Sequence, residues 1–363
     1  MLRAAPLTAT LKTLATVALG AAGGWAASLI GMPLPWMLGS MLLVGIVGIA
    51  GLGIGEHRVH VPLWLRTSMV PVVGVMLGSG FTPDVVAGMR QWWITMAMLV
   101  VFMLVAVAVV YQFYRRIMRF DPITSYFCSI PGGLIDMALI GESAGGDGRT
   151  ISLVHFSRIL AAVLTIPFLM QWLYGPVGGQ GLGHAPAGWE LELIDVVVLA
   201  ACAVVGYFGG RAIRLPGAQI SGPLILSAIA HGTGITAATP PDALVVVAQI
   251  VVGSALGARF AGVSVRAAGR ILGASFCGTM LMFSVTLAVA LALSTVVDEP
   301  LPALILAYAP GGVTEMSLIA LSMNIGVAFV TAHHIARIGL AVGLMPFLWR
   351  YVVEKRVAPT RET

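Results

Sequence analysis

"IPGGLIDMALIGE" (residues 130–142) and "APGGVTEMSLIAL" (residues 309–321) are two closely similar interruptions of an otherwise apolar sequence. Each contains a proline, two glycines and, five residues after the proline, an acid, Asp136 or Glu315. A Pro-Gly-Gly string interrupts a helix, so its backbone N–H and C=O groups need other hydrogen-bond partners. Hydrocarbon offers none, and we therefore expect each break to be buried in protein or to line a polar cavity.

The rest of the chain is strongly apolar. Of its 363 residues, 58% are hydrophobic and 10% are charged, and the mean hydropathy is +0.97, whereas a soluble domain carries about 25% charged residues. A helix of about 20 apolar residues crosses the hydrocarbon core. Ten apolar runs approach this length: Leu11–Ile30, Leu34–Ile54, Val61–Phe81, Trp92–Phe113, Ile151–Tyr174, Ile194–Gly210, Ala218–Ile235, Ala243–Phe260, Ile271–Val296 and Ile325–Leu348. The composition predicts an all-α polytopic membrane protein with ten spans.

The net charge of +5 is an orientation signal, because the basic residues gather in alternate loops. Those after the spans are Arg115, Arg116, Arg119, Arg211, Arg214, Arg266, Arg270, Arg350, Lys355 and Arg356, and Arg3 and Lys12 lie near the N-terminus. Placing them in the cytoplasm predicts a multi-pass protein of the bacterial inner membrane with both termini inside. We expect the lipid bilayer as a partner, and no nucleic acid.

The sequence repeats internally. Subtracting 131 from 310 gives an offset of 179, which also superposes Asp136 on Glu315 and Met137 on Met316. Nearer the N-terminus the offset is 183, since Gly39 then falls on Gly222. The repeat predicts two halves, residues 1–178 and 179–363, joined by the glycine-rich loop "GPVGGQGLGHAPAG" (175–188).

Five spans per half is an odd number, so the second half is expected to be inverted relative to the first. Inverted repeats are typical of secondary transporters, whose binding site lies near the membrane midplane. The segments 122–143 and 301–322 were not counted as spans; counting them gives six spans per half and a parallel repeat. We favour re-entrant or broken helices that enter from opposite faces.

Asp136 and Glu315 lie in apolar surroundings, where an acidic residue is costly and is a functional candidate. Either acid can carry a proton, or bind Na⁺ together with Ser317 and freed carbonyl oxygens; the alternative is a solvated residue at the membrane surface. Glycine permits unusual dihedral angles and close approach of a ligand to the backbone. The glycines expected to do so are Gly132, Gly133, Gly311 and Gly312; the alternative is a tight surface turn.

Two histidine–arginine pairs follow the breaks, and in each pair the two residues are three positions apart on one helix face. These are His155 with Arg158 and His334 with Arg337, also related by the offset of 179. The arginine can hold an anionic ligand or pair with the acid of its own half, and we favour the pairing because an unpaired charge in a membrane is costly. His333 has no histidine counterpart in the first half.

Metal chemistry and nucleotide chemistry are not favoured by the motifs. His155, His333 and His334, with one of the acids, are enough metal ligands in number, but adjacent histidines point to different helix faces. Walker-type and Gly-x-Ser-x-Gly motifs do not occur in the sequence. We expect no cofactor beyond a coupling ion, H⁺ or Na⁺, and no enzyme activity.

On these motifs the sequence resembles the duplicated integral-membrane AbrB family of Gram-negative bacteria, which is also carried under an ammonia-monooxygenase name. It does not resemble the soluble DNA-binding AbrB regulators. The resemblance extends over almost the whole chain and includes both Pro-Gly-Gly-x-x-Asp/Glu-Met strings, both His-x-x-Arg pairs and "MPLPWMLG" (32–39). It implies a membrane protein of two repeats, and the family's name is tied to regulation of gene expression.

The favoured expectation is a secondary transporter, driven by protons or sodium, for a small anionic organic solute. By architecture the pattern is similar to carriers in which two glycine-rich re-entrant segments meet at the substrate, such as 2-hydroxycarboxylate transporters, and this is an analogy at the level of the fold. The second expectation is a membrane-embedded ligand sensor linked to gene regulation, and the least favoured is a monooxygenase. A homodimer is left open.

Overall fold

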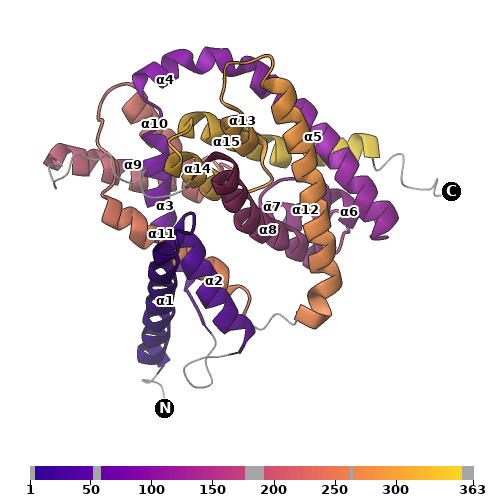
Figure 1. The fold of residues 1–363 in the computed structure, drawn as a ribbon, viewed down its shortest axis with the longest axis horizontal. Helices are drawn as coiled ribbons and strands as arrows, with labels where there is room; N and C mark the ends of the chain where they lie inside the picture. Colours follow the sequence, from indigo (N-terminus) through magenta and orange to yellow (C-terminus); the bar gives the residue numbers. More distant parts are fainter. Residues whose placement is uncertain (1–4, 52–58, 176–191, 262–264, 354–363) are drawn as a thin grey trace. The chain divides into compact units, whose positions relative to one another are not determined.

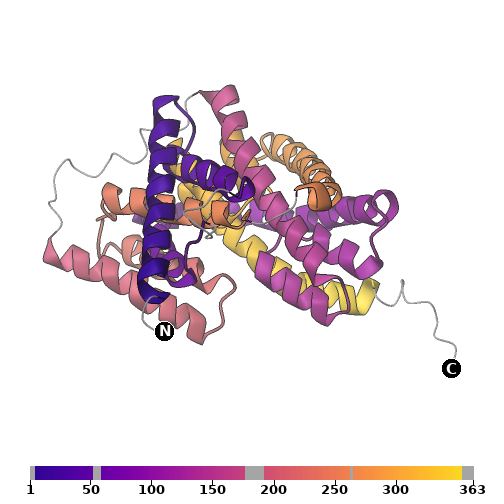
Figure 2. The ribbon, with the colours of Figure 1, turned by 90° about the horizontal axis from the view of Figure 1, so that it is seen from below.

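The computed structural model describes residues 5–51, 59–175, 192–261 and 265–353, and these ranges are helical without any strand (Figure 1). The described chain forms two compact units, and each unit takes segments from both halves of the sequence. Unit 1 comprises residues 1–87, 164–267 and 318–328, and unit 2 comprises 88–163, 268–317 and 329–363. Figure 2 gives a second view of the same helices. The division at residue 178 concerns the sequence repeat and stays a prediction.

Each of the ten apolar runs contains one long helix. They are α1 (Ala5–Leu29), α2 (Pro35–Ile49), α3 (Leu63–Gly78), α5 (Trp93–Gln112), α8 (Gly148–Tyr174), α9 (Leu193–Ala212), α10 (Ala218–Gly232), α11 (Asp242–Ala258), α12 (Val265–Leu293) and α15 (Val327–Leu348). A short helix, α4 (Pro83–Gly88), and a 3-10 turn, η1 (Met89–Trp92), precede α5. Two π-helical turns, η2 (Phe113–Ile117) and η3 (Trp349–Val353), follow α5 and α15.

Five helical segments of the described chain are long and apolar enough to cross a membrane, which makes the chain a multi-pass membrane protein. These segments are Pro83–Ile117, Gly148–Tyr174, Leu193–Ala212, Gly269–Leu293 and Val327–Tyr351. The helices α2, α3 and α11 are apolar but have only 15 to 17 residues. Of the ten predicted spans, five thus contain a helix that is long and apolar enough to cross a membrane, and the other five stay predictions. The rest of the glycine-rich loop (176–188), Arg3, Lys355 and Arg356 lie outside the described residues, and the orientation of the termini stays a prediction.

In unit 1, two pairs of helices cross at glycines. A Cβ atom on Gly39 of α2 would lie 2.3 Å from the carbonyl oxygen of Gly23 on α1, and a Cβ on Gly222 of α10 would lie 2.0 Å from that of Gly206 on α9. The missing side chains let the backbones touch, as is common between membrane helices. Because 23 and 206, like 39 and 222, differ by 183, the two crossings occupy equivalent positions of the sequence repeat.

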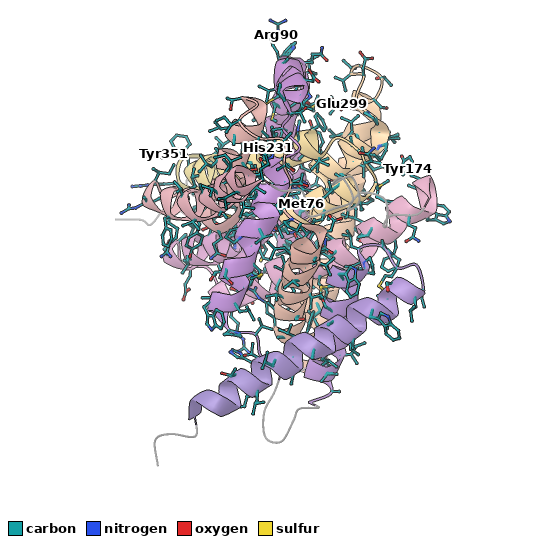
Figure 3. The ribbon with its side chains drawn as sticks, turned by 90° about the vertical axis from the view of Figure 1, so that its left-hand side faces the viewer. Met76, Arg90, Tyr174, His231, Glu299 and Tyr351 are labelled. Carbon is teal, nitrogen blue, oxygen red and sulfur yellow. The ribbon has the colours of Figure 1, made fainter. Side chains whose placement is uncertain are left out.

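The third helix of each half packs against the second helix of the other half. Gly78 of α3 meets the carbonyl oxygen of Leu224 on α10, and Gly257 of α11 meets that of Met41 on α2; a Cβ would lie 2.6 Å and 2.5 Å away, respectively. Figure 3 labels Met76 on α3, close to the first of these crossings. The two halves are thus interleaved inside unit 1.

The starts of α2 and α10 also correspond. Leu34 precedes α2 with φ 45° and ψ 55°, and Gly217 precedes α10 with φ 61° and ψ 33°. Both residues are in the left-handed region, where a residue with a side chain pays roughly 1–2 kcal/mol and glycine pays little. The same turn therefore begins both helices, and at Leu34 it is formed in spite of the side chain.

Unit 2 contains both Pro-Gly-Gly strings, the helix that the first string divides, and the helix that the second string divides as far as Ser317. The first string separates α6 (Pro122–Ser129) from α7 (Leu134–Ser143), and the second separates α13 (Leu301–Tyr308) from α14 (Val313–Ser322). Broken helices are therefore confirmed at both strings, while a re-entrant course through a membrane stays a prediction. Unit 2 also holds α5, the first part of α8, and most of α12 and α15.

Aspartates cap two helices of unit 2. The backbone N–H of Thr124 donates to Asp121 at the start of α6, over 2.9 Å. At the start of α8 the hydroxyl of Thr150 and the N–H of Arg149 donate to Asp147. The bond from the Thr150 hydroxyl is the main reason why the pKa of the Asp147 carboxyl is lowered. Both caps satisfy orphan N–H groups of a first helical turn.

Candidate ligand site at the two helix breaks

All of the site residues proposed from the sequence lie in unit 2. They come from four elements: the two breaks with the helices that follow them, α7 and α14, and the two long helices α8 and α15. The sequence repeat thus places two copies of one local structure in a single compact unit, and the copies can be compared atom by atom.

In the first break, Arg158 of α8 binds the backbone at the end of α6. Its Nη1 donates to the carbonyl oxygen of Ile130 over 2.9 Å and lies 3.5 Å from that of Cys128. Its Nη2 lies 3.5 Å from the carbonyl oxygen of Gly132. These carbonyls have no partner within a helix. Those at the C-terminus of α6 form the negative end of its dipole, which favours a cation.

Arg337 of α15 does the same in the second break. Its Nη1 donates to the carbonyl oxygen of Ala309 and its Nη2 to that of Gly311. Residues 309 and 311 are the repeat equivalents of 130 and 132. The structure gives both guanidinium groups backbone carbonyl partners; the expected pairing of each arginine with the acid of its own half stays a prediction.

The two histidines also bind equivalent carbonyls. His155 Nε2 lies 2.9 Å from the carbonyl oxygen of Phe127, and His334 Nε2 lies 2.9 Å from that of Leu306. Since a carbonyl oxygen only accepts, each Nε2 carries the proton and each Nδ1 is left as an acceptor. Both rings are fully buried. The histidines are thus fixed in one tautomer by the ends of α6 and α13.

The two copies differ at the remaining ring nitrogen. In the first copy, Arg158 Nη2 donates to His155 Nδ1 over 2.7 Å. In the second copy, His334 Nδ1 and Arg337 Nε are both buried and have no hydrogen-bond partner among the described residues. In the first copy the arginine and the histidine thus bond to each other, whereas the second copy leaves one donor, Arg337 Nε, and one acceptor, His334 Nδ1, without a hydrogen bond in the described chain.

Both acids lie in the first turn of the helix that follows a break. A Cβ atom on Gly133 would lie 2.5 Å from Oδ2 of Asp136, and a Cβ on Gly312 would lie 2.0 Å from Oε2 of Glu315. Each carboxylate is therefore folded back over the second glycine, at the positive end of a helix dipole. Asp136 is half-buried, and Glu315 is buried with 7% of its surface exposed.

These glycines are needed for close approach and not for unusual dihedral angles. Gly133 has φ −64° and ψ 136°, a conformation open to any residue. Gly132, Gly311 and Gly312 are absent from the positive-φ residues of the described chain. The sequence expectation of unusual dihedrals was wrong; what approaches these glycines is the chain's own side chains, and close approach of a ligand to their backbone stays a prediction.

Two methionines, missed from the sequence, cover the first glycine of each break. A Cβ on Gly132 would lie 3.0 Å from Cγ of Met137, and a Cβ on Gly311 would lie 2.6 Å from Cε of Met316. Both methionines are fully buried. Their signal was present in the repeat, which superposes Met137 on Met316.

Ser317 and His333 lie near the second break in different roles. The hydroxyl of Thr331 donates to Ser317 Oγ over 2.8 Å, which joins α14 to α15. The ring of His333 packs 4.1 Å from that of Phe329, and its Nδ1 lies 2.8 Å from the Phe329 carbonyl oxygen. His333 Nε2 is buried without a partner among the residues that the structure describes.

Both arginines are buried charges. Arg158 and Arg337 are 4% and 3% exposed. A buried charge is costly unless an opposite charge joins it, because the surroundings screen it poorly. A small anion bound nearby would neutralise such a charge, so each arginine suits recognition of a carboxylate or a similar group. In the described ranges, no three His, Cys, Asp or Glu side chains gather as a metal-ligand set.

Comparisons with known proteins agree with the family seen in the motifs. The family model described as "Transition state regulatory protein AbrB" matches residues 52–353. The chain is 26% identical over 364 residues to "Uncharacterized protein YhjN" of Bacillus subtilis (strain 168), covering 94% of this chain and 93% of that protein. It is 21% identical over 322 residues to "Putative regulator AbrB" of Escherichia coli (strain K12), covering 88% and 90%. No solved structure matches the chain.

Proposed function

The chain belongs to the AbrB family, as a member with membrane-spanning helices, and on this premise we propose that it is a secondary carrier for a small anionic organic solute. In this proposal the protein lies in the bacterial inner membrane. Residues 1–178 and 179–363 are inverted repeats, and the two broken helices are re-entrant from opposite faces. The solute binds where the breaks meet, and H⁺ or Na⁺ drives its movement.

One observation carries the proposal: two buried arginines at equivalent positions of the repeat are each anchored to the backbone of a broken helix. Burying these charges is expensive unless an opposite charge joins them. The hydrogen bonds to the carbonyls also couple the position of each arginine to that of its helix break. A ligand that neutralises the pair therefore stabilises one arrangement of both broken helices, as a carrier requires.

The acids are proposed as the sites of the coupling ion. Asp136 and Glu315 begin α7 and α14 and lie over the backbone of the breaks, so an ion bound there contacts the same segments as the solute. Charge-neutral Asp136→Asn with Glu315→Gln keeps the size of both side chains. We expect this double variant to fold and bind solute but to lose exchange of labelled solute in proteoliposomes.

Glu142→Gln is the matched control, because Glu142 is an exposed acid on the same helix as Asp136. It is expected to leave exchange unchanged. If the double variant exchanges solute at the wild-type rate, the acids have no coupling role.

A ligand sensor is the second candidate, and the names of similar proteins favour it: the family model is described as a regulatory protein, and one relative is named "Putative regulator AbrB". A sensor would use the same arginines to bind an anion and would pass the signal to a partner without moving the ligand. Binding without counterflow in proteoliposomes would favour the sensor over the carrier.

A further inference from the structure

We propose that the second break is the recognition half of the site, and that its ligand is a carboxylate bearing an O–H or N–H donor next to the carboxyl group. Arg337 Nε and His334 Nδ1 would bind the two groups. This inference rests on the proposed binding of a small organic anion. It specifies which copy of the local structure determines ligand specificity, and which chemical groups of the ligand that copy recognises.

The asymmetry of the two copies is the first support. His155 Nδ1 receives a hydrogen bond from Arg158 over 2.7 Å, so this ring nitrogen is satisfied within the first copy. His334 and Arg337 have the same spacing on one helix face, yet His334 Nδ1 and Arg337 Nε are unpartnered within the described residues. Side chains that are fully or almost fully buried seldom leave polar atoms unused, so two such atoms at a broken helix need an explanation, which a bound ligand supplies.

The chemistry of the two unused atoms is the second support. Arg337 Nε carries a hydrogen and donates, whereas His334 Nδ1 accepts, because its Nε2 proton is committed to the Leu306 carbonyl. A plain carboxylate supplies only acceptors and can satisfy the arginine alone. A carboxylate with a neighbouring hydroxyl or amino group supplies an acceptor and a donor side by side, and so satisfies both residues.

His333, next to His334 in the sequence, is a further difference between the two copies. His333 Nε2 is a third buried nitrogen without a partner in the described chain, and its repeat equivalent is the apolar Val154. Its ring lies against Phe329 and 5.8 Å from Tyr308. The second copy therefore holds one more buried polar nitrogen, beside aromatic rings, at a position where the first copy has an apolar residue.

The test uses pairs of probes that differ only by a hydroxyl group. Lactate is compared with propionate, and malate with succinate, by thermal stabilisation of the purified full chain in detergent. We expect the hydroxylated member of at least one pair to bind about tenfold or more tightly, since a site built for a hydroxyl rejects its analogue.

The variants are His334→Gln and, as the repeat-matched comparison, His155→Gln. A glutamine amide can still donate to the carbonyl that each Nε2 binds, but it offers no acceptor at the position of Nδ1. We expect His334→Gln to bring the affinity ratio between the two probes close to one, and His155→Gln to retain the wild-type ratio. The ratio is informative even if either variant is less stable.

Equal binding of hydroxylated and plain probes to the wild type would overturn the inference, and so would an equal loss of the ratio in both variants. If no carboxylate stabilises the wild type, the anion-binding part of the proposed function fails with it. If the expected ratios are found without counterflow, the recognition site stands and carriage alone fails.

Discussion

Gly312→Ala probes whether the Glu315 carboxylate is held over the second break. The added Cβ would lie 2.0 Å from Oε2 of Glu315, whereas ordinary contacts of a Cβ begin near 3.4 Å. The carboxylate oxygen must therefore move by about 1.4 Å, and it moves more easily than the backbone because it ends a flexible side chain. The same reasoning gives about 0.9 Å for Gly133→Ala and Asp136, where the separation is 2.5 Å.

The energy at stake is that of a negative charge at a helix N-terminus. Such a charge contributes about 0.3–1 kcal/mol at exposed sites and up to about 2 kcal/mol when partly buried. Since Glu315 is 7% exposed, we expect Glu315→Gln to cost about 1 kcal/mol in the wild-type background. In the Gly312→Ala background the carboxylate has already been displaced, and the same substitution should cost close to nothing.

A double-mutant cycle measures this coupling. Unfolding in mixed micelles by titration with a denaturing detergent gives the free energies of the wild type, the two single variants and the double variant. We expect a coupling of about 1 kcal/mol between positions 312 and 315. Gly343→Ala is the control, because a Cβ on Gly343 has open space within 4 Å; it should be additive with Glu315→Gln. Additive behaviour of Gly312→Ala would refute the placement of the carboxylate.

Three further predictions test the packing and the capping. Gly206→Ala should lower the free energy of unfolding by about 1–3 kcal/mol, because its Cβ would lie 2.6 Å from a backbone atom of α10. Gly209→Ala on the same helix meets open space and should raise it by about 0.5–1 kcal/mol. Equal effects of the two substitutions would contradict the close crossing of α9 and α10. Arg158→Gln should lower the free energy of unfolding by about 3 kcal/mol, because it leaves backbone carbonyls unpaired. Arg149→Gln, at an exposed position, should lower it by less than about 0.5 kcal/mol. Detergent titration measures both values. Asp147→Ala should lower the free energy of unfolding by about 1 kcal/mol at neutral pH. Because the folded-state pKa of this carboxyl is lowered, the difference in stability from the wild type should vanish as the pH falls through that pKa. A difference in stability that is constant with pH would contradict the cap.

The repeat allowed much of the site to be predicted. The offset of 179 paired Arg158 with Arg337 and Asp136 with Glu315, and the structure gives both members of each pair the same local position. What the arginines bind was not predictable, because backbone carbonyls carry no signal in the sequence. The unused Nδ1 of His334 was not predictable either, since identical spacing gave the Nδ1 of His155 a partner, whereas that of His334 has none among the described residues.

The packing of the two halves was beyond the sequence for a similar reason. Gly78 and Gly257 mark close helix contacts, but a glycine does not say which helix will approach it. Interleaving of the halves within unit 1 therefore appears only in the structure. The length of α2 was overestimated at its C-terminal end: hydropathy extends the run to Ile54, whereas α2 ends at Ile49 and a turn follows at residues 50–51.

Counterflow into proteoliposomes tests the central claim most directly. Purified wild-type protein is reconstituted, the vesicles are loaded with an excess of an unlabelled organic anion that stabilises the protein, and uptake of the labelled anion is followed over time. The carrier proposal predicts a transient accumulation of label above its equilibrium level, and none in protein-free vesicles. A protein that binds the anion yet shows no accumulation would contradict carriage and leave a membrane-embedded sensor as the better account of the site.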